Sequence, residues 1–184
     1  MMRVIAGIHK GRQLKAVPGN NTRPTTDKVK ESIFQIIGPF FQGGKALDLF
    51  AGSGSLGIEA LSRGMDNCIF VDKHPKAIQI IRENTSLLRL EEQSEIFRAD
   101  AFRALAAVAK RELRFDLIFL DPPYSKISYL ELLETIIKEQ LLNDEGIIYC
   151  EHDLKDILPE QVSGLSLIKQ VKYGTIGVTI YQKI

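Results

Sequence analysis

One apolar run of the chain ends in FLDPPYSK, residues 119–126, where a carboxylate and an aromatic ring flank two prolines. Proline has a fixed φ and no N–H group, so Pro122 and Pro123 form a turn that presents carbonyl oxygens without competing amide donors. Asp121 adds a carboxylate acceptor, and Tyr124 adds a flat aromatic face with a polar end. Such a site accepts hydrogen bonds beside an aromatic platform. Its natural complement is a planar group that carries NH₂.

This pattern predicts chemistry on an exocyclic amine, whose nitrogen is a poor nucleophile because its lone pair is delocalised into the ring. If the Asp121 carboxylate and the Pro122 carbonyl accept both N–H hydrogens, the nitrogen moves toward tetrahedral geometry and the lone pair becomes available. These bonds strengthen as positive charge develops on the nitrogen, so they favour the transition state. Tyr124 would stack on the base and orient it. This chemistry requires no metal, and we expect none.

A second motif, LDLFAGSGSLG at residues 47–57, has glycines at G-x-G-x-x-G spacing. Glycines let the backbone pass close beneath a ligand, and the helix that follows offers free N–H groups at its N-terminus. Asp72 ends the next apolar run, where its carboxylate could accept both hydroxyls of a ribose. These features alone fit a dinucleotide-binding loop, and the glycine spacing by itself is a weak signal.

Two further acids favour another ligand. Asp48 stands four residues before Gly52, where it would repel a pyrophosphate and suit a cationic group. Asp100 ends a third apolar run, where it could accept from the amino group of adenine. Each acid taken alone is more simply a helix cap. Together with Asp72 and the glycine loop they indicate S-adenosylmethionine, which has an adenine, a ribose, no phosphate and a cationic amino-acid end.

The elements around these motifs alternate from residue 45 onward. Continuous apolar segments indicate parallel strands that are covered on both faces, and the helices between them are amphipathic. The chain ends in two segments that turn near YGTIG, residues 173–177. We therefore expect an α/β fold with a doubly wound, mostly parallel seven-stranded sheet. We expect strands at 45–50, 67–72, 95–100, 115–121 and 146–151, and helices at 55–64, 74–88, 101–113 and 129–142.

The front of the chain differs from the rest in charge. Residues 1–30 carry seven Lys or Arg side chains against one acid, although the net charge of the whole chain is only +1. A basic arm suggests a polyanionic partner, but charge alone leaves a solvated surface equally open. The pattern predicts a basic β-hairpin extension in residues 1–22, then a domain in 23–184 whose first helix is capped by Thr25 or Thr26. The candidate RNA-binding residues are Arg3, Lys10, Arg12, Lys15 and Arg23.

The glycine motif resembles that of the Rossmann-like S-adenosylmethionine-dependent methyltransferases, and DPPY resembles their [N/D]-P-P-[Y/F] signature for planar amino or amide nitrogens. The resemblance implies that the loop and Asp48 hold the methionine end of the cofactor. Asp72 would bind the ribose, and Asp100 would bind the adenine. The candidate cofactor residues are Thr25, Asp48, Phe50, Ala51, Gly52, Ser53, Gly54, Asp72, Lys73, Asp100, Ala101 and Phe102; the candidate catalytic residues are Asp121, Pro122, Pro123 and Tyr124.

The whole chain is similar to the bacterial family that methylates a guanine N2 of 16S ribosomal RNA. The matching stretches are RVIAGIHKGRQL, TRPTTDKVKESIF, LDLFAGSGSLGIEALSRG, DLIFLDPPY and KYGTIGVTIY. The resemblance implies that RPTTDKVKE, residues 23–31, helps to close the cofactor pocket and that the hairpin touches RNA. One departure is GTIGVT near the C-terminus, where the family usually has a polar residue and then Thr after YG. It affects the contacts of the closing hairpin and leaves the chemistry intact.

Several alternatives stay open on the motifs alone. DPPY does not separate guanine N2 from adenine N6, cytosine N4 or a protein glutamine amide, and the basic arm favours nucleic acid. Three other functions are open: methylation of a DNA base, oxidation or reduction by a NAD-dependent oxidoreductase, and RNA binding by a non-catalytic assembly factor. No apolar run is long enough for a membrane span, and Cys68 and Cys150 lie in apolar runs, so we expect buried thiols in a cytoplasmic protein. Nothing in the sequence suggests an obligate dimer, and we expect a monomer. Glu151, after the fifth strand, is either a pocket wall or surface.

Overall fold

The computed structural model describes residues 2–19, 26–123 and 127–184. Its helices are α1 Asp27–Ile37, α2 Ser55–Ser62, α3 Pro75–Leu87, α4 Ala101–Lys110 and α5 Tyr129–Lys138, with a short 3₁₀ helix η1 at Glu91–Gln93. Its strands are β1 Met2–Arg3, β2 Gln13–Leu14, β3 Lys45–Asp48, β4 Asn67–Asp72, β5 Ser94–Arg98, β6 Phe115–Leu120, β7 Leu142–Asp153, β8 Leu165–Tyr173 and β9 Ile176–Lys183. No helix in these ranges is long and apolar enough to cross a membrane.

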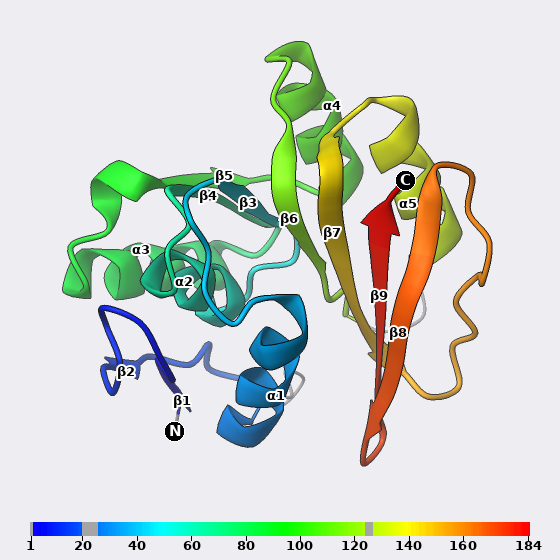
Figure 1. Cartoon of the computed structure of the whole chain (residues 1–184). Coiled ribbons are helices and arrows are strands. Elements are labelled where there is room, and N and C mark those ends of the chain that lie inside the picture. The colour runs from blue at the N-terminus through cyan, green and yellow to red at the C-terminus, as the bar shows by residue number, and fades with distance from the viewer. Residues whose placement is uncertain (1, 20–25, 124–126) are drawn as a thin grey trace.

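The main sheet has seven strands in the order β5-β4-β3-β6-β7-β9-β8 (Figure 1). The first five of these are parallel, and β9 runs antiparallel to both β7 and β8. The predicted doubly wound, mostly parallel seven-stranded sheet is confirmed. Strand order reverses between β3 and β6, so the two strands that precede the glycine loop and the DPPY motif are neighbours.

Both faces of the sheet are covered, as the continuous apolar strands predicted. Neighbouring residues of one strand enter different cores: Ala46 packs with α1, α2 and α3, while Leu47 packs with α4 and α5. Cys68 and Ile69 divide in the same way on β4. Cys68 and Cys150 are buried free thiols, which confirms the prediction for both.

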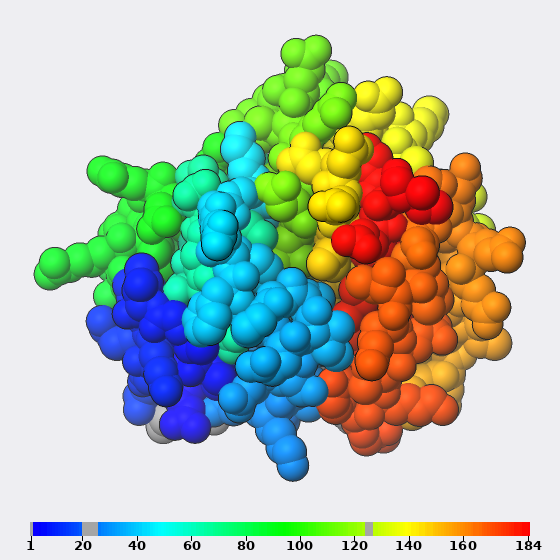
Figure 2. All heavy atoms as spheres, viewed as in Figure 1, coloured from blue at the N-terminus to red at the C-terminus, as the bar shows by residue number. Residues whose placement is uncertain are grey.

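The N-terminal hairpin is shorter than the sequence pattern predicted. β1 and β2 pair through Met2 with Leu14 and Arg3 with Gln13, and the backbone of Val4 adds bonds to Arg12 and Gly11. Beyond Val4 the N–H groups of Ile5 and Ala6 donate to Glu59 of α2 instead. Figure 2 shows this segment lying beside α1 as part of one continuous surface.

Two helix ends can be compared with the sequence. Thr26 caps α1, since its hydroxyl accepts from the Val29 N–H at 3.3 Å. The helix expected at 55–64 ends at Ser62, with Arg63 as its C-cap and Gly64 next with φ +121°. A residue in this left-handed region after the cap is the usual place for glycine.

Candidate functional site

The glycine loop and the DPPY turn lie next to each other at the point where strand order reverses. Asp48 is paired with Phe119 in the β3–β6 register, and the Leu49 N–H donates to the Phe119 carbonyl at 3.2 Å. Both segments therefore leave the sheet at its carboxyl edge, where open α/β sheets bind ligands.

The loop between β3 and α2 uses the conformations that glycine allows. Gly52 has φ +57° and Gly54 has φ +85°, and Gly54 is the N-cap of α2. A Cβ on Gly52 would meet no atom within 4 Å, so the loop backbone faces open space there. A Cβ on Gly57 would lie 2.4 Å from the Phe70 ring, so that glycine is needed for helix–sheet packing. The remaining loop candidates lie between these: Phe50 and Ser53 are half-buried and Ala51 is buried.

Asp48 lies beneath this loop rather than on the surface. It is 2% exposed, and its Oδ2 accepts from the Gly57 N–H at 3.1 Å. Burial raises the pKa of Asp48 to about 7, while the Gly57 N–H opposes the shift and the charge of Asp72 adds to it. Near neutral pH this carboxyl is therefore divided between its charged and neutral forms.

Asp72 fixes the loop to the end of β4. Its Oδ2 accepts from the Gly52 N–H at 2.9 Å, and its Oδ1 accepts from the His74 N–H at 2.9 Å. A carboxylate oxygen can accept a second hydrogen bond, so Asp72 keeps the capacity to accept from a ribose hydroxyl. Lys73 beside it is exposed, and its carbonyl accepts from Arg98 Nε.

Asp100 is the N-cap of α4, where its Oδ1 accepts from the Arg103 N–H at 3.0 Å. This is the capping role that a single acid at a strand end suggests, and it is compatible with a second bond to a ligand because Asp100 is exposed. Ala101 is buried, and Phe102 packs half-buried against the core beneath α4 and α5.

The DPPY motif follows directly on β6. Asp121 is half-buried, Pro122 is buried and Pro123 is exposed. Burial raises the pKa of Asp121 well above its usual range, and the charge and hydrogen bond of Glu151 raise it further, with a smaller effect from Asp48. Tyr124 lies outside the described residues, as do Thr25 and Arg23.

Glu151, whose role the sequence left open, belongs to the wall of this site. It is 6% exposed near the end of β7. The Tyr149 hydroxyl donates to its Oε1 at 3.0 Å, and the Tyr129 hydroxyl donates to its backbone carbonyl at 2.6 Å. The available signal for a wall position was that Glu151 ends the strand next to that of Asp121, because the ends of parallel strands meet at one edge of the sheet.

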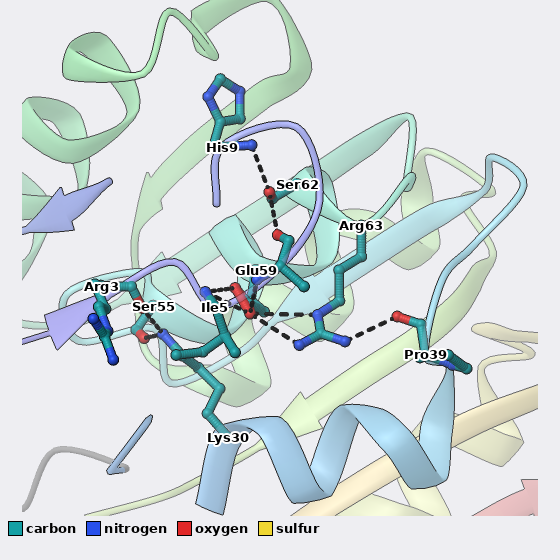
Figure 3. A network of polar contacts seen from close by, with 10 residues as sticks. Arg3, Ile5, His9, Lys30, Pro39, Ser55, Glu59, Ser62 and Arg63 are labelled. Atoms are coloured by element: carbon teal, nitrogen blue, oxygen red, sulfur yellow. Dashed lines mark hydrogen bonds and ion pairs between the residues drawn. The ribbon is translucent and has the colours of Figure 1, made fainter. Parts of the chain in front are cut away.

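A buried polar network joins the N-terminal segment to α2 (Figure 3). Glu59, fully buried, accepts from the backbone N–H groups of Ile5 and Ala6 and from the Arg63 guanidinium, whose Nη2 lies 3.2 Å from Oε1. The Ser62 hydroxyl donates to the Ala6 carbonyl at 2.7 Å. Local sequence patterns did not predict this network. The available signal was that Glu59 and Arg63, an acid and a base four residues apart, are the only charged residues of the segment 55–64.

Two side chains extend this connection to the glycine loop. Lys30, 1% exposed, donates from Nζ to the Arg3 carbonyl at 2.6 Å and to the Ser55 hydroxyl at 3.0 Å. Asn84, also buried, donates from Nδ2 to the carbonyls of Ser53 and Lys15. The segment that carries the basic arm therefore contacts the loop itself.

The basic arm is exposed at all four candidate positions that the structure describes, which are Arg3, Lys10, Arg12 and Lys15. Two of these charges have acidic partners: Arg3 Nε lies 2.7 Å from Asp27, and Lys15 Nζ lies 2.8 Å from Glu83. Arg12 donates to the Leu87 carbonyl at the end of α3. In the three described ranges, no group of three or more His, Cys, Asp or Glu side chains is placed to hold a metal.

Comparison with known proteins gives a consistent set of relatives. A family model described as "Conserved hypothetical protein 95" matches residues 2–182. The chain is 56% identical over 182 residues to the Bacillus subtilis (strain 168) protein named "Putative rRNA methyltransferase YlbH", with 99% of each chain covered. It is 32% identical to "Ribosomal RNA small subunit methyltransferase D" of Haemophilus influenzae, with 98% of this chain and 93% of the relative covered. A solved structure, "Putative methyltransferase yhhF from Escherichia coli", superposes with a TM-score of 0.84 at 28% identity, over 99% of this chain and 97% of that one.

Proposed function

The chain belongs to the Conserved hypothetical protein 95 family, and from that membership we propose that it methylates the N2 amine of a guanine in small-subunit (16S) ribosomal RNA. Methylation of ribosomal RNA is the activity that the names of its relatives carry. The choice of guanine N2 rests on the resemblance of the whole chain, together with the acceptor groups at Asp121 and Pro122.

S-adenosylmethionine is the methyl donor, and it supplies a methyl group on a cationic sulfonium. The residues at the carboxyl edge of the sheet fit this cofactor. The loop backbone at Gly52 faces open space, and Asp48 beneath it offers a negative charge for the cationic end. Asp72 ends β4 and Asp100 follows the neighbouring strand β5, so they would bind the ribose and the adenine respectively.

The adjacency of β3 and β6 is the observation that carries the proposal. It brings the turn at Asp121 beside the loop that holds the methionine end, so an amine bound to the turn lies within reach of the methyl group. The Asp121 carboxyl and the Pro122 carbonyl accept the two N–H hydrogens of that amine. Both bonds strengthen as the nitrogen becomes positive, which lowers the barrier to transfer.

Residues 2–15 supply the RNA-binding surface of the enzyme. Phosphate contacts provide most of the sequence-independent affinity of such proteins, and the exposed side chains of Lys10 and Arg12 suit them. The target guanine must be unstacked before its amine can enter the site, which is least costly in an RNA loop.

Transfer of labelled methyl groups to small ribosomal subunits from a strain without this enzyme tests the proposal. Nucleoside analysis should find a single N2-methylguanosine per 16S RNA. Asp121→Asn should remove the label while S-adenosylhomocysteine still binds, as measured by calorimetry. Label on adenine, cytosine, DNA or a protein glutamine would contradict the proposed substrate, and stabilisation by NAD in place of S-adenosylhomocysteine would contradict the cofactor.

A further inference from the structure

The carboxyl groups of Asp121 and Glu151 form a pair at the ends of adjacent strands. Leu120 of β6 is in register with Cys150 of β7, so the next residue of each strand, Asp121 and Glu151, also lie side by side. Glu151 is buried, and its charge adds to the effect of burial in raising the pKa of Asp121. Two carboxyl groups side by side in a buried site do not both ionise readily, so we expect the pair to hold one proton.

Glu151 is held from two directions. The hydroxyl of Tyr149, a side chain with no solvent exposure, donates to Glu151 Oε1 at 3.0 Å. The Tyr129 hydroxyl of α5 donates to the Glu151 backbone carbonyl at 2.6 Å. The carboxyl of Glu151 therefore has a fixed place, and Asp121 is oriented against it.

We propose, on the basis of the function proposed above, that Glu151 is a positioning residue for methyl transfer. Its carboxyl shares one proton with Asp121, which fixes the Asp121 side chain and leaves its other oxygen free to accept an N–H of the amine. The pair then carries a single negative charge where positive charge develops on the nitrogen.

The pair also accepts the proton that the product amine loses. The amine nitrogen forms its bond to the methyl carbon as the carbon–sulfur bond breaks, and the electron pair of that bond stays on sulfur. The proton lost from the nitrogen passes to the free oxygen of Asp121 while the shared proton moves onto Glu151. The pair is then neutral with two protons, and it returns one to water when the product leaves.

The titratable groups around the pair are consistent with one shared proton. Among the described residues, those that face Asp121 are Glu151 of β7 and Asp48 of β3, while the hydroxyls of Tyr129 of α5 and Tyr149 of β7 donate to Glu151. Burial raises the pKa of Asp121 and the neighbouring acids raise it further, which favours one proton on the pair.

Two substitutions separate this role from a structural one, because they move the Asp121 proton in opposite directions. Glu151→Gln removes the neighbouring charge, so the pH midpoint of the Asp121 carboxyl should fall by about one unit or more. Tyr149→Phe removes a donor to Glu151, which raises the proton affinity of the pair, so the midpoint should rise. Carbon NMR of the labelled Asp121 carboxyl, assigned by its loss in Asp121→Asn, measures both shifts.

Kinetics complete the test. Glu151→Gln should lower kcat by about tenfold or more with the KM for cofactor and RNA unchanged, since the loss concerns proton placement and leaves binding intact. Glu139→Gln, an exposed carboxylate at the end of α5, is the matched control and should change neither quantity. Wild-type kcat in Glu151→Gln, or an unmoved Asp121 midpoint, would overturn the inference. Failure of the wild-type protein to methylate guanine would instead refute the proposed function, and the NMR titration would still decide whether the pair exists.

Discussion

The side-chain amide of Asn84 donates a hydrogen bond to the backbone carbonyl of Ser53 at 2.9 Å, which joins α3 to the glycine loop. The same amide donates to the Lys15 carbonyl at 3.0 Å, and its oxygen accepts from the Lys15 N–H at 2.8 Å. One buried side chain thus holds both the glycine loop and the end of the basic hairpin.

Asn84→Asp should disturb both segments at once. The substitution keeps the shape of the side chain but replaces its two donors with an oxygen that faces two carbonyl oxygens. Since a buried polar group without a partner costs about 1–3 kcal/mol and a charged one costs more, we expect the free energy of unfolding to fall by at least about 3 kcal/mol. Affinity for S-adenosylhomocysteine should also fall. Urea denaturation and calorimetry measure the two effects.

Asn67→Asp is the matched control, because it makes the same change at an exposed position at the start of β4. It should leave both quantities within experimental error. If Asn84→Asp destabilised the fold yet bound the cofactor as tightly as the wild type, the contact with Ser53 would have no influence on the loop.

Glu59→Gln should release the N-terminal segment from α2. Glu59 and Arg63 are 0% and 1% exposed as side chains, and removing one member of a buried ion pair leaves the other charge uncompensated. Such a change costs about 3–5 kcal/mol. Hydrogen exchange of the Ile5 and Ala6 amides, which donate to Glu59, should accelerate more than exchange in β6.

Glu83→Gln provides the comparison for that experiment, because the Lys15–Glu83 pair is exposed and such pairs contribute about 1 kcal/mol or less. Equal exchange rates at Ile5 in the wild type and in Glu59→Gln would show that the segment is held by its apolar contacts instead.

Local sequence patterns were sufficient for the elements and the loop, and insufficient for the contacts between distant segments. The run at 67–72 predicted β4 with both boundaries correct, because continuous apolar residues and a terminal acid are local signals. Glu59 and Ile5 are 54 residues apart, and no periodicity relates them. The pairing of β9 with β7 likewise depends on tertiary packing, which is why the sequence predicted a closing hairpin but not the order of its strands in the sheet.

The acidic residues of the site also show that local sequence patterns do not predict contacts between segments. Asp72 was correctly placed at the end of β4, whereas β5 ends at Arg98 and Asp100 follows it as the N-cap of α4. Their bonds to Gly52 and Arg103 depend on backbone geometry that a sequence does not display. The burial of Glu151 could be predicted only once β7 was known to lie beside β6.

Lys10→Ala should weaken RNA binding through electrostatics alone. Lys10 is exposed on the hairpin, and removing one ion pair with a phosphate should reduce the slope of log affinity against log salt by about 1. Arg3→Ala should have a smaller effect, because the Arg3 guanidinium is already paired with Asp27 at 2.7 Å. Filter binding to small-subunit RNA over a salt series tests both variants. Lys138→Ala, exposed near the end of α5, is the control, and an unchanged slope for Lys10→Ala would remove the hairpin from the RNA interface.

Asp48 should make protein stability and cofactor affinity respond to pH in opposite directions. Its pKa is raised by burial from 3.8 to about 7, so the folded state binds a proton that the unfolded state releases. The stability that this proton contributes is fully present below the unfolded pKa and is lost as the pH rises through about 7. Affinity for the cationic cofactor should increase as the pH rises through about 7, because only the ionised carboxyl of Asp48 attracts the cofactor.

Asp48→Asn separates these two effects. At pH 8.5 the variant should be more stable than the wild type by up to about 4 kcal/mol, because it has no buried charge to accommodate. At pH 5.5 the difference should fall to about 2 kcal/mol, because the folded carboxyl is then neutral while the unfolded one is still ionised; it should disappear only below the unfolded pKa of 3.8. Cofactor affinity of the variant should be low and independent of pH. Guanidinium denaturation and calorimetry at the two pH values measure both quantities, and a wild-type affinity that stays constant from pH 5.5 to 8.5 would exclude Asp48 as the group that attracts the sulfonium end.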